Sequence, residues 1–124
     1  MHLYLNEPRA MPFDFFDANP DLKGVEHPQL GQASLCTSQP AVLDYLRTAT
    51  ERLFRHVPQL AGFFTISMSE NPTHCWSHHR GAQCPRCADR DMAEVIAEVN
   101  TALAEGAWAA KPDAQATAWA WAWP

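Results

Sequence analysis

The amino-acid sequence predicts an α/β fold in which parallel strands are joined by crossover helices. Short apolar segments typical of strands occur at 2–5, 63–68 and 114–124. Amphipathic helical patterns of about 15 residues or more separate the last two segments and precede the second one. A strand followed by a long helix and another strand is typical of parallel pairing, because the helix carries the chain back to the start of the sheet.

The first third of the chain contains short elements. Residues 2–5 form an apolar strand, and a polar turn follows it. Three clustered phenylalanines, followed by the helix breakers Asn19-Pro20 and Gly24, predict a short helix over 12–18 and then a loop that extends through Gln32. Residues 33–36 are expected to form a brief extended segment.

The first long helix is predicted from its start and stop signals. Ser38 is a suitable N-cap, Pro40 stands in the first turn where its missing N–H does no harm, and Pro58 ends the pattern after about His56. The apolar stripe of this helix consists of Val42, Leu46, Ala49, Leu53 and Val57.

A second long helix and a last strand complete the chain. Asp89 or Asp91 caps the helix, and Gly106 is a plausible residue just beyond its end. The apolar stripe consists of Met92, Val95, Ile96, Val99 and Leu103. The tail then alternates strictly, with Trp119, Trp121 and Trp123 on one face and Ala118, Ala120 and Ala122 on the other. This aromatic face needs a partner layer or stacks on a sugar.

Composition limits the class of protein. The 124 residues suffice for one domain, and a hydrophobic content of 47% is ordinary for a globular chain. A net charge of −5 argues against nucleic-acid binding, and no apolar run is long enough for a membrane span. The first residues do not resemble a signal peptide, so we expect a cytoplasmic protein whose cysteines are free or metal-bound.

Two carboxylates follow predicted strands and are candidate catalytic groups. Glu70 lies two residues after Met68, and Glu7 occupies the equivalent place after the first strand. Active residues of parallel α/β folds gather at the carboxyl ends of strands, and glycoside hydrolysis needs two carboxyl groups there. Asn6 and Asn71 would support them. The alternative is structural: Glu70 caps its loop, and Glu7 pairs with Arg9.

The loop after the central strand is dense in metal-binding side chains. Cys84 and Cys87 form a CxxC pair, and Cys75 precedes it. With His74 as fourth ligand, these residues could form a structural zinc site, and a four-cysteine site that uses Cys36 is also conceivable. His78 or His79 could replace His74. Free thiols, a disulfide from Cys87 to Cys75 or Cys84, and a redox role for Cys84 remain open.

Two further residues of this loop are candidate contacts to a carbohydrate substrate. His74 could bind substrate instead of metal. The face of Trp76 could stack on a sugar ring, or the residue could close the loop as a lid.

Three segments together resemble a larger family. LYLNEPRAMP, SLCTSQPAVLDYLRTATERLF and GFFTISMSENPTHC, with CPRC and AWAWAWP, look like a slice of a (β/α)8-barrel glycoside hydrolase, similar to family 20 hexosaminidases and related bacterial barrel proteins. Asn6-Glu7-Pro8 matches the Asn-Glu-Pro signature of clan A glycosidases. The resemblance implies that Glu70 is the general acid/base. Ser69 departs from the family, which places an aspartate before that glutamate.

The resemblance also implies an incomplete barrel. A complete barrel needs about 250 residues, so residues 1–124 are expected to form a single partial (β/α)8 domain from a longer chain. Its uncovered strand edges would favour self-association. Two functions follow as hypotheses: a carbohydrate-active hydrolase, or a non-catalytic binding or scaffold module with a zinc-stapled loop at 74–87.

Overall fold

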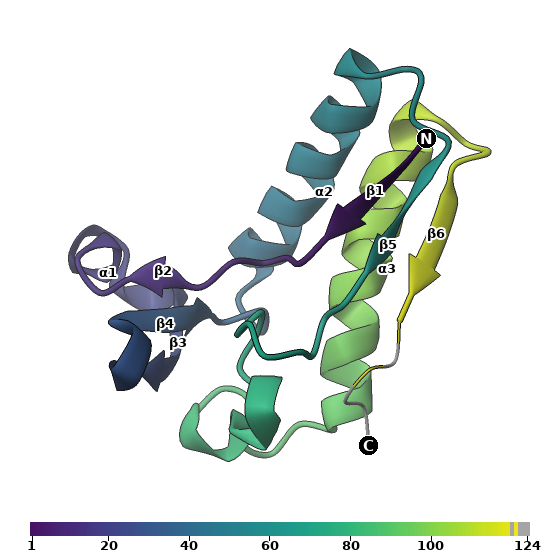
Figure 1. Ribbon diagram of the computed structural model, residues 1–124. Coiled ribbons are helices and arrows are strands. Elements are labelled where there is room, and N and C mark those ends of the chain that lie inside the picture. The colour runs from purple at the N-terminus through teal and green to yellow at the C-terminus, as the bar shows by residue number, and fades with distance from the viewer. Residues whose placement is uncertain (120, 122–124) are drawn as a thin grey trace.

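The computed structural model describes residues 1–119 and 121 and shows two small sheets beside a pair of long helices (Figure 1). The strands and α-helices are β1 (His2–Leu5), β2 (Met11–Pro12), α1 (Phe15–Ala18), β3 (Lys23–His27), β4 (Gln32–Leu35), α2 (Pro40–His56), β5 (Gly62–Thr65), α3 (Met92–Ala110) and β6 (Gln115–Ala118). Four short 3₁₀ helices lie between them, at Pro20–Leu22, Pro28–Leu30, Ser77–His79 and Gly81–Gln83.

The larger sheet is parallel, with the strand order β1-β5-β6. Leu5 lies opposite Thr65, and Thr65 lies opposite Ala118, so the three strands end at the same level. Their carboxyl ends point towards the segment 66–91, which we call the cysteine loop (Figure 1). The three strands expected at 2–5, 63–68 and 114–124 are therefore present, although β5 and β6 are shorter than expected.

Helices α2 and α3 cover one face of the parallel sheet (Figure 1). Leu3, Leu5 and Phe63 point from the strands into the core that the helices complete. The buried helical residues of that core are Leu46, Phe54, Val99, Ala102, Leu103, Ala104 and Ala107. Burying such side chains contributes about 25 cal/mol for each Å² removed from water.

The end of α3 differs from its prediction. Gly106 was expected just beyond the helix, but it lies inside α3, which continues to Ala110. A Cβ atom at Gly106 would lie 2.3 Å from the carbonyl oxygen of Arg47 in α2. The glycine therefore permits a close approach of the two helices, a role that its place in the sequence does not reveal. The start of α3 is as expected, with the Asp91 carboxylate accepting the N–H groups of Ala93 and Glu94.

The smaller sheet is antiparallel, with the strand order β2-β4-β3. The prediction of a loop through Gln32 is wrong, because Lys23–His27 forms a strand that pairs with Gln32–Leu35. Gly31 turns the chain between the two strands with a φ of 64°. The sheet packs on α1 and on the start of α2 through Phe16, Ala33, Leu35 and Val42.

The prediction of a partial (β/α)8 barrel is wrong. The described residues form one parallel and one antiparallel sheet, each of three strands, with two long helices and one short one. A barrel of this type contains parallel strands throughout, and the antiparallel sheet has no place in it. The sequence pattern could not distinguish a barrel from other folds, because all α/β folds alternate strands and helices. The alternation does not determine how many strands the sheet contains.

The second face of the parallel sheet carries a row of aromatic side chains. Tyr4 stacks on Phe64 with ring centroids 5.1 Å apart, and Trp119 lies 6.5 Å beyond Phe64. Trp121 lies 5.3 Å from Trp119, and both are about half exposed. The predicted alternation at Ala120, Ala122 and Trp123 falls outside the described residues.

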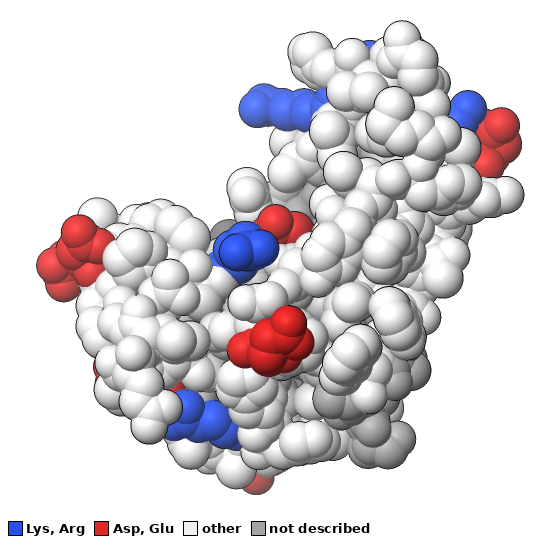
Figure 2. Space-filling model, viewed as in Figure 1, with Lys and Arg blue, Asp and Glu red and all other residues white. Residues whose placement is uncertain are grey.

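In the view of Figure 2, charged side chains are scattered and form no basic patch. Among the described residues, no helix is long and apolar enough to cross a membrane.

Candidate metal centre

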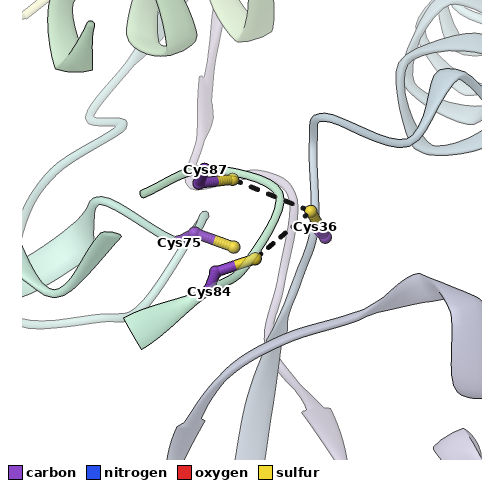
Figure 3. A group of neighbouring side chains, drawn as sticks. All are labelled: Cys36, Cys75, Cys84 and Cys87. Atoms are coloured by element: carbon purple, nitrogen blue, oxygen red, sulfur yellow. Dashed lines mark hydrogen bonds between the residues drawn. The ribbon is translucent and has the colours of Figure 1, made fainter. Parts of the chain in front are cut away.

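Four cysteines from three separate parts of the chain converge at one point. Cys36 follows β4, Cys75 lies early in the cysteine loop, and Cys84 and Cys87 lie later in it (Figure 3). Their four Sγ atoms all lie within 4.8 Å of one another. All four residues are buried, with at most 2% of their surface exposed. We call this group the four-cysteine centre.

The spacing of the sulfur atoms fits a tetrahedral metal ion. The Sγ atom of Cys36 lies 3.7 Å from that of Cys84 and 3.7 Å from that of Cys87. A zinc ion with Zn–S bonds of about 2.3 Å places its sulfur ligands about 3.8 Å apart in an ideal tetrahedron. The two distances agree. The donor set could therefore hold a soft or borderline metal ion.

The cysteines are free thiols, and the disulfides considered from the sequence are not formed. A disulfide would bring two sulfur atoms to about 2 Å, far closer than they lie here. Hydrogen bonds from Cys75 and Cys87 lower the pKa of Cys36. The same contacts to Cys36 raise the pKa of Cys75, and they raise that of Cys87 to about 11. One sulfur is thus easily ionised, and its charge opposes ionisation of the others unless a cation is present.

The CxxC segment forms a tight turn that points both of its sulfurs inward. The N–H of Cys87 donates to the carbonyl of Cys84 at 3.0 Å, and the N–H of Ala88 donates to the same carbonyl at 2.9 Å. The N–H of Cys84 donates in turn to the carbonyl of Gly81. Because the turn pairs these backbone groups, Cys84 and Cys87 can be buried while Pro85 and Arg86 between them stay exposed.

The segment around Cys75 is fixed by the Ser77 hydroxyl. Its Oγ accepts the N–H of Thr73 at 2.9 Å and the N–H of His74 at 3.2 Å, while the Ser77 N–H donates to the His74 carbonyl. Thr73 also donates its hydroxyl to the carbonyl of Ser67, two residues after the end of β5. Cys75 therefore sits on a closed, buried turn.

Two glycines allow this packing. A Cβ atom at Gly24 in β3 would lie 2.5 Å from Sγ of Cys75 and 2.9 Å from the carbonyl oxygen of Ser34. A Cβ atom at Gly81 would lie 2.1 Å from the ring of Trp76. Neither role is evident from the sequence. Gly24 carries no local signal for a role in a site that is assembled from residues more than ten positions away.

Side chains around the centre hold the ligands in place. Arg90 donates to Oγ of Ser38 at 2.9 Å and forms an ion pair with Glu98 of α3 at 2.6 Å. Oγ of Ser38 lies 3.2 Å from Sγ of Cys87. These contacts join the start of α2, the cysteine loop and α3. Ser38 was predicted as a helix cap, but Gln39 is the capping residue and the hydroxyl of Ser38 faces the sulfur instead.

Two arginines of the loop attach it to the small sheet. Arg86 donates to the backbone carbonyls of Asp21 and Lys23 at 2.6 and 3.0 Å. Arg80 lies 3.4 Å from Nδ1 of the buried His27, whose Nε2 is 2.9 Å from Oγ of Ser34. Three or more thiolate ligands would give a zinc centre a net negative charge, and the guanidinium of Arg86, which interacts with Cys36, would offset part of it.

The structure places Cys75, Cys84 and Cys87 together with Cys36 and leaves His74 out of the group. His74 is fully buried, and its Nδ1 accepts the N–H of Trp76 at 3.2 Å. Burial lowers the pKa of His74 to about 4, against a smaller opposing effect of the Ser67 backbone. The ring is therefore neutral near pH 7 and serves the turn beside the centre. Of the two donor sets open from the sequence, the four-cysteine set is the one that the fold assembles.

The remaining predicted site residues lie apart from the metal centre. Glu7 and Glu70 follow the neighbouring strands β1 and β5, as expected. Asn6 is buried, whereas Glu70 and Asn71 are exposed. Trp76 is half-buried and packs against the cysteines and Gly81, which matches the lid interpretation. The catalytic and sugar-binding roles of these residues stay predictions.

The fold and the site together define a small α/β chain with a buried four-cysteine centre. No protein-family model matches this sequence, and no curated protein or solved structure matches it either.

Proposed function

We propose that the chain is a zinc-stabilised binding or scaffold module in which the four-cysteine centre staples the cysteine loop to the small sheet. The observation that carries this proposal is the convergence of four buried Sγ atoms within 4.8 Å of one another. Four thiolates and no open position are typical of structural zinc sites, whereas catalytic sites keep one position for water or substrate.

Burial supports a structural role over a reactive one. A redox cysteine pair needs access to its partner, and reactive thiols are partly exposed. All four sulfurs here belong to residues with at most 2% exposure, and Trp76 packs over them. The cysteine loop also has few regular elements of its own, since two short 3₁₀ helices are its only helical segments before α3. A bound metal would supply the stabilisation that regular structure does not.

Metal analysis tests the proposal directly. The chain is purified without added metal and examined for zinc by mass spectrometry, and its thermal unfolding is recorded before and after dialysis against a strong chelator. We expect close to one zinc per chain, and we expect removal of the metal to lower the melting temperature because metal binding is coupled to folding. Cys84→Ser should reproduce the effect of the chelator. Thr48→Ala, on the exposed side of α2, serves as a control.

Two results would overturn the proposal. The first is a chain that contains no metal, takes up none when zinc is added, and unfolds identically with and without chelator. The second is rapid alkylation of Cys84 in the folded, metal-treated chain, which would favour the redox alternative.

A further inference from the structure

A cavity of about 540 Å³ lies between the small sheet, α1 and the start of α2, and none of the four cysteines lines it. Its lining is mostly apolar and includes Met11, Phe15, Leu22, Leu35, Val42 and Tyr45. Figure 2 shows the molecule hollowed between the lobe of the small sheet and the column of α2. A volume of this size is typical of pockets for small molecules.

Two charged residues of opposite sign also line the cavity: Glu7 and Arg9. Oε2 of Glu7 accepts the backbone N–H of Arg9 at 3.1 Å, which fixes the carboxylate at the end of β1. Among the described residues, neither side chain forms an ion pair with a neighbour. The cavity thus offers an anion and a cation beside an apolar interior.

The position of Glu7 is unfavourable without a partner. Burial raises the pKa of this carboxyl group, and the backbone and charge of Arg9 offset only part of the effect. An ammonium group placed at the carboxylate would restore the interactions that burial removes. The exposed guanidinium of Arg9 can at the same time bind a carboxylate with two hydrogen bonds.

From these features we infer that the cavity binds an α-amino acid with a large apolar side chain. The α-ammonium group pairs with Glu7, the α-carboxylate pairs with Arg9, and the side chain enters the apolar part of the cavity beside Phe15 and Val42. A zwitterion satisfies both charges and leaves the net charge of the site unchanged. A ligand that lacks either charged group leaves one of them desolvated and unpaired. This inference goes beyond the metal-binding proposal and involves none of the four cysteines.

Isothermal titration calorimetry with four probes tests the inference. L-phenylalanine has both charges and an apolar side chain, 3-phenylpropanoate lacks the ammonium group, 2-phenylethylamine lacks the carboxylate, and glycine lacks the side chain. We expect saturable binding of L-phenylalanine and affinities at least about tenfold lower for the other three. The metal-containing chain is used throughout.

Two variants connect the charges to the residues. Glu7→Gln should lower the affinity for L-phenylalanine about tenfold and leave that for 3-phenylpropanoate unchanged, because the second probe has no group for Glu7. Arg9→Gln should likewise lower the affinity for L-phenylalanine about tenfold, and it should leave the affinity for 2-phenylethylamine unchanged, because that probe has no group for Arg9. The zinc content of each variant is measured alongside, so that loss of the fold or of the metal is distinguished from loss of this site.

The inference is overturned if L-phenylalanine does not bind the metal-containing chain. It is also overturned if a probe with one charge binds as tightly as L-phenylalanine, or if Glu7→Gln weakens all probes equally. The last two results would mean that the cavity recognises an apolar group and not a zwitterion.

Discussion

The hydroxyl oxygen of Ser38 lies 3.2 Å from the sulfur of Cys87. Arg90 donates a hydrogen bond to the same oxygen and is itself held by Glu98. With Arg90 occupying an acceptor position on the oxygen, the hydroxyl proton is free to point at the sulfur. The contact stabilises the thiolate form of Cys87, which is the form that binds a metal ion.

Replacement of Ser38 should therefore weaken metal binding without removing a ligand. We expect Ser38→Ala to lower the affinity for zinc about tenfold, the lower end of the range for residues that support metal ligands. Competition with a coloured chelator measures the change. Thr48→Ala removes a hydroxyl from the exposed side of α2, the helix that follows Ser38, and should leave the affinity unchanged. Equal affinities for the Ser38 variant and the unchanged chain would contradict the prediction.

The identity of the fourth ligand can be decided by a pair of variants. Cys36→Ser should abolish stoichiometric zinc binding, because it removes one of four converging sulfurs. His74→Asn should keep one zinc per chain, since the Asn side-chain oxygen can accept the Trp76 N–H that Nδ1 accepts now. Replacement of zinc by cobalt gives a visible spectrum that reports the number of sulfur ligands. A spectrum that changes on His74→Asn but not on Cys36→Ser would reverse the assignment.

Gly24 offers a test at a residue that is not a ligand. Gly24→Ala places a methyl group within 2.5 Å of the Cys75 sulfur, and the Ser34 carbonyl blocks the other direction. We expect a loss of about 1 to 3 kcal/mol in unfolding free energy and a weaker affinity for zinc. Gly31→Ala is the control: it has open space but a φ of 64°, so its cost in stability comes from the backbone, and zinc affinity should not change.

The close contact between the long helices predicts a change in stability opposite in sign to the change that helix propensity predicts. Alanine is favoured over glycine within a helix by about 1 kcal/mol. Gly106→Ala should nonetheless destabilise the fold, because the new methyl group would meet the Arg47 carbonyl of α2. Ala97→Gly, on the exposed side of α3, measures the propensity effect alone. Urea unfolding of both variants checks the prediction, which fails if Gly106→Ala is stabilising.

The half-buried carboxyl of Glu7 makes stability depend on pH. Because burial raises its pKa in the folded state, the folded chain holds this proton more tightly than the unfolded chain does. Ionised Glu7 therefore lowers stability at higher pH, and the penalty disappears as pH falls below the pKa of the unfolded state. We expect Glu7→Gln to raise stability near pH 7 and to have no effect near pH 3. Melting temperatures at the two pH values measure the difference.

The sequence predicted local elements better than their assembly. The two long helices follow from apolar periodicity and from signals such as Pro40 and Asp91, which act within one turn. The antiparallel sheet was missed because the segment Lys23–His27 contains Gly24, Glu26 and a single strongly apolar residue, Val25. Its pairing with β4 is set by contacts between strands, and no local pattern states them.

The metal centre was predicted only in part, again because contacts between distant segments leave no local pattern in the sequence. Cys75, Cys84 and Cys87 lie close together in the sequence, so their spacing alone suggested a site. Cys36 could be named only as one option, because its place beside them depends on β4 and on the tether that Arg86 makes to the small sheet. His74 competed for the same position on chemical grounds, and only the folded chain shows that its ring faces the turn.

The spread of the ligands along the chain has a consequence for the order of assembly. Cys36 is separated from Cys84 and Cys87 by 48 and 51 positions, while the other three cysteines lie in one short segment. Closing a long loop costs more chain entropy than closing a short one. We therefore expect a newly made chain to capture the ion first with its three neighbouring sulfurs. The fourth sulfur completes the shell when β4 arrives, so the ion would act as a template that selects the correct docking of the small sheet.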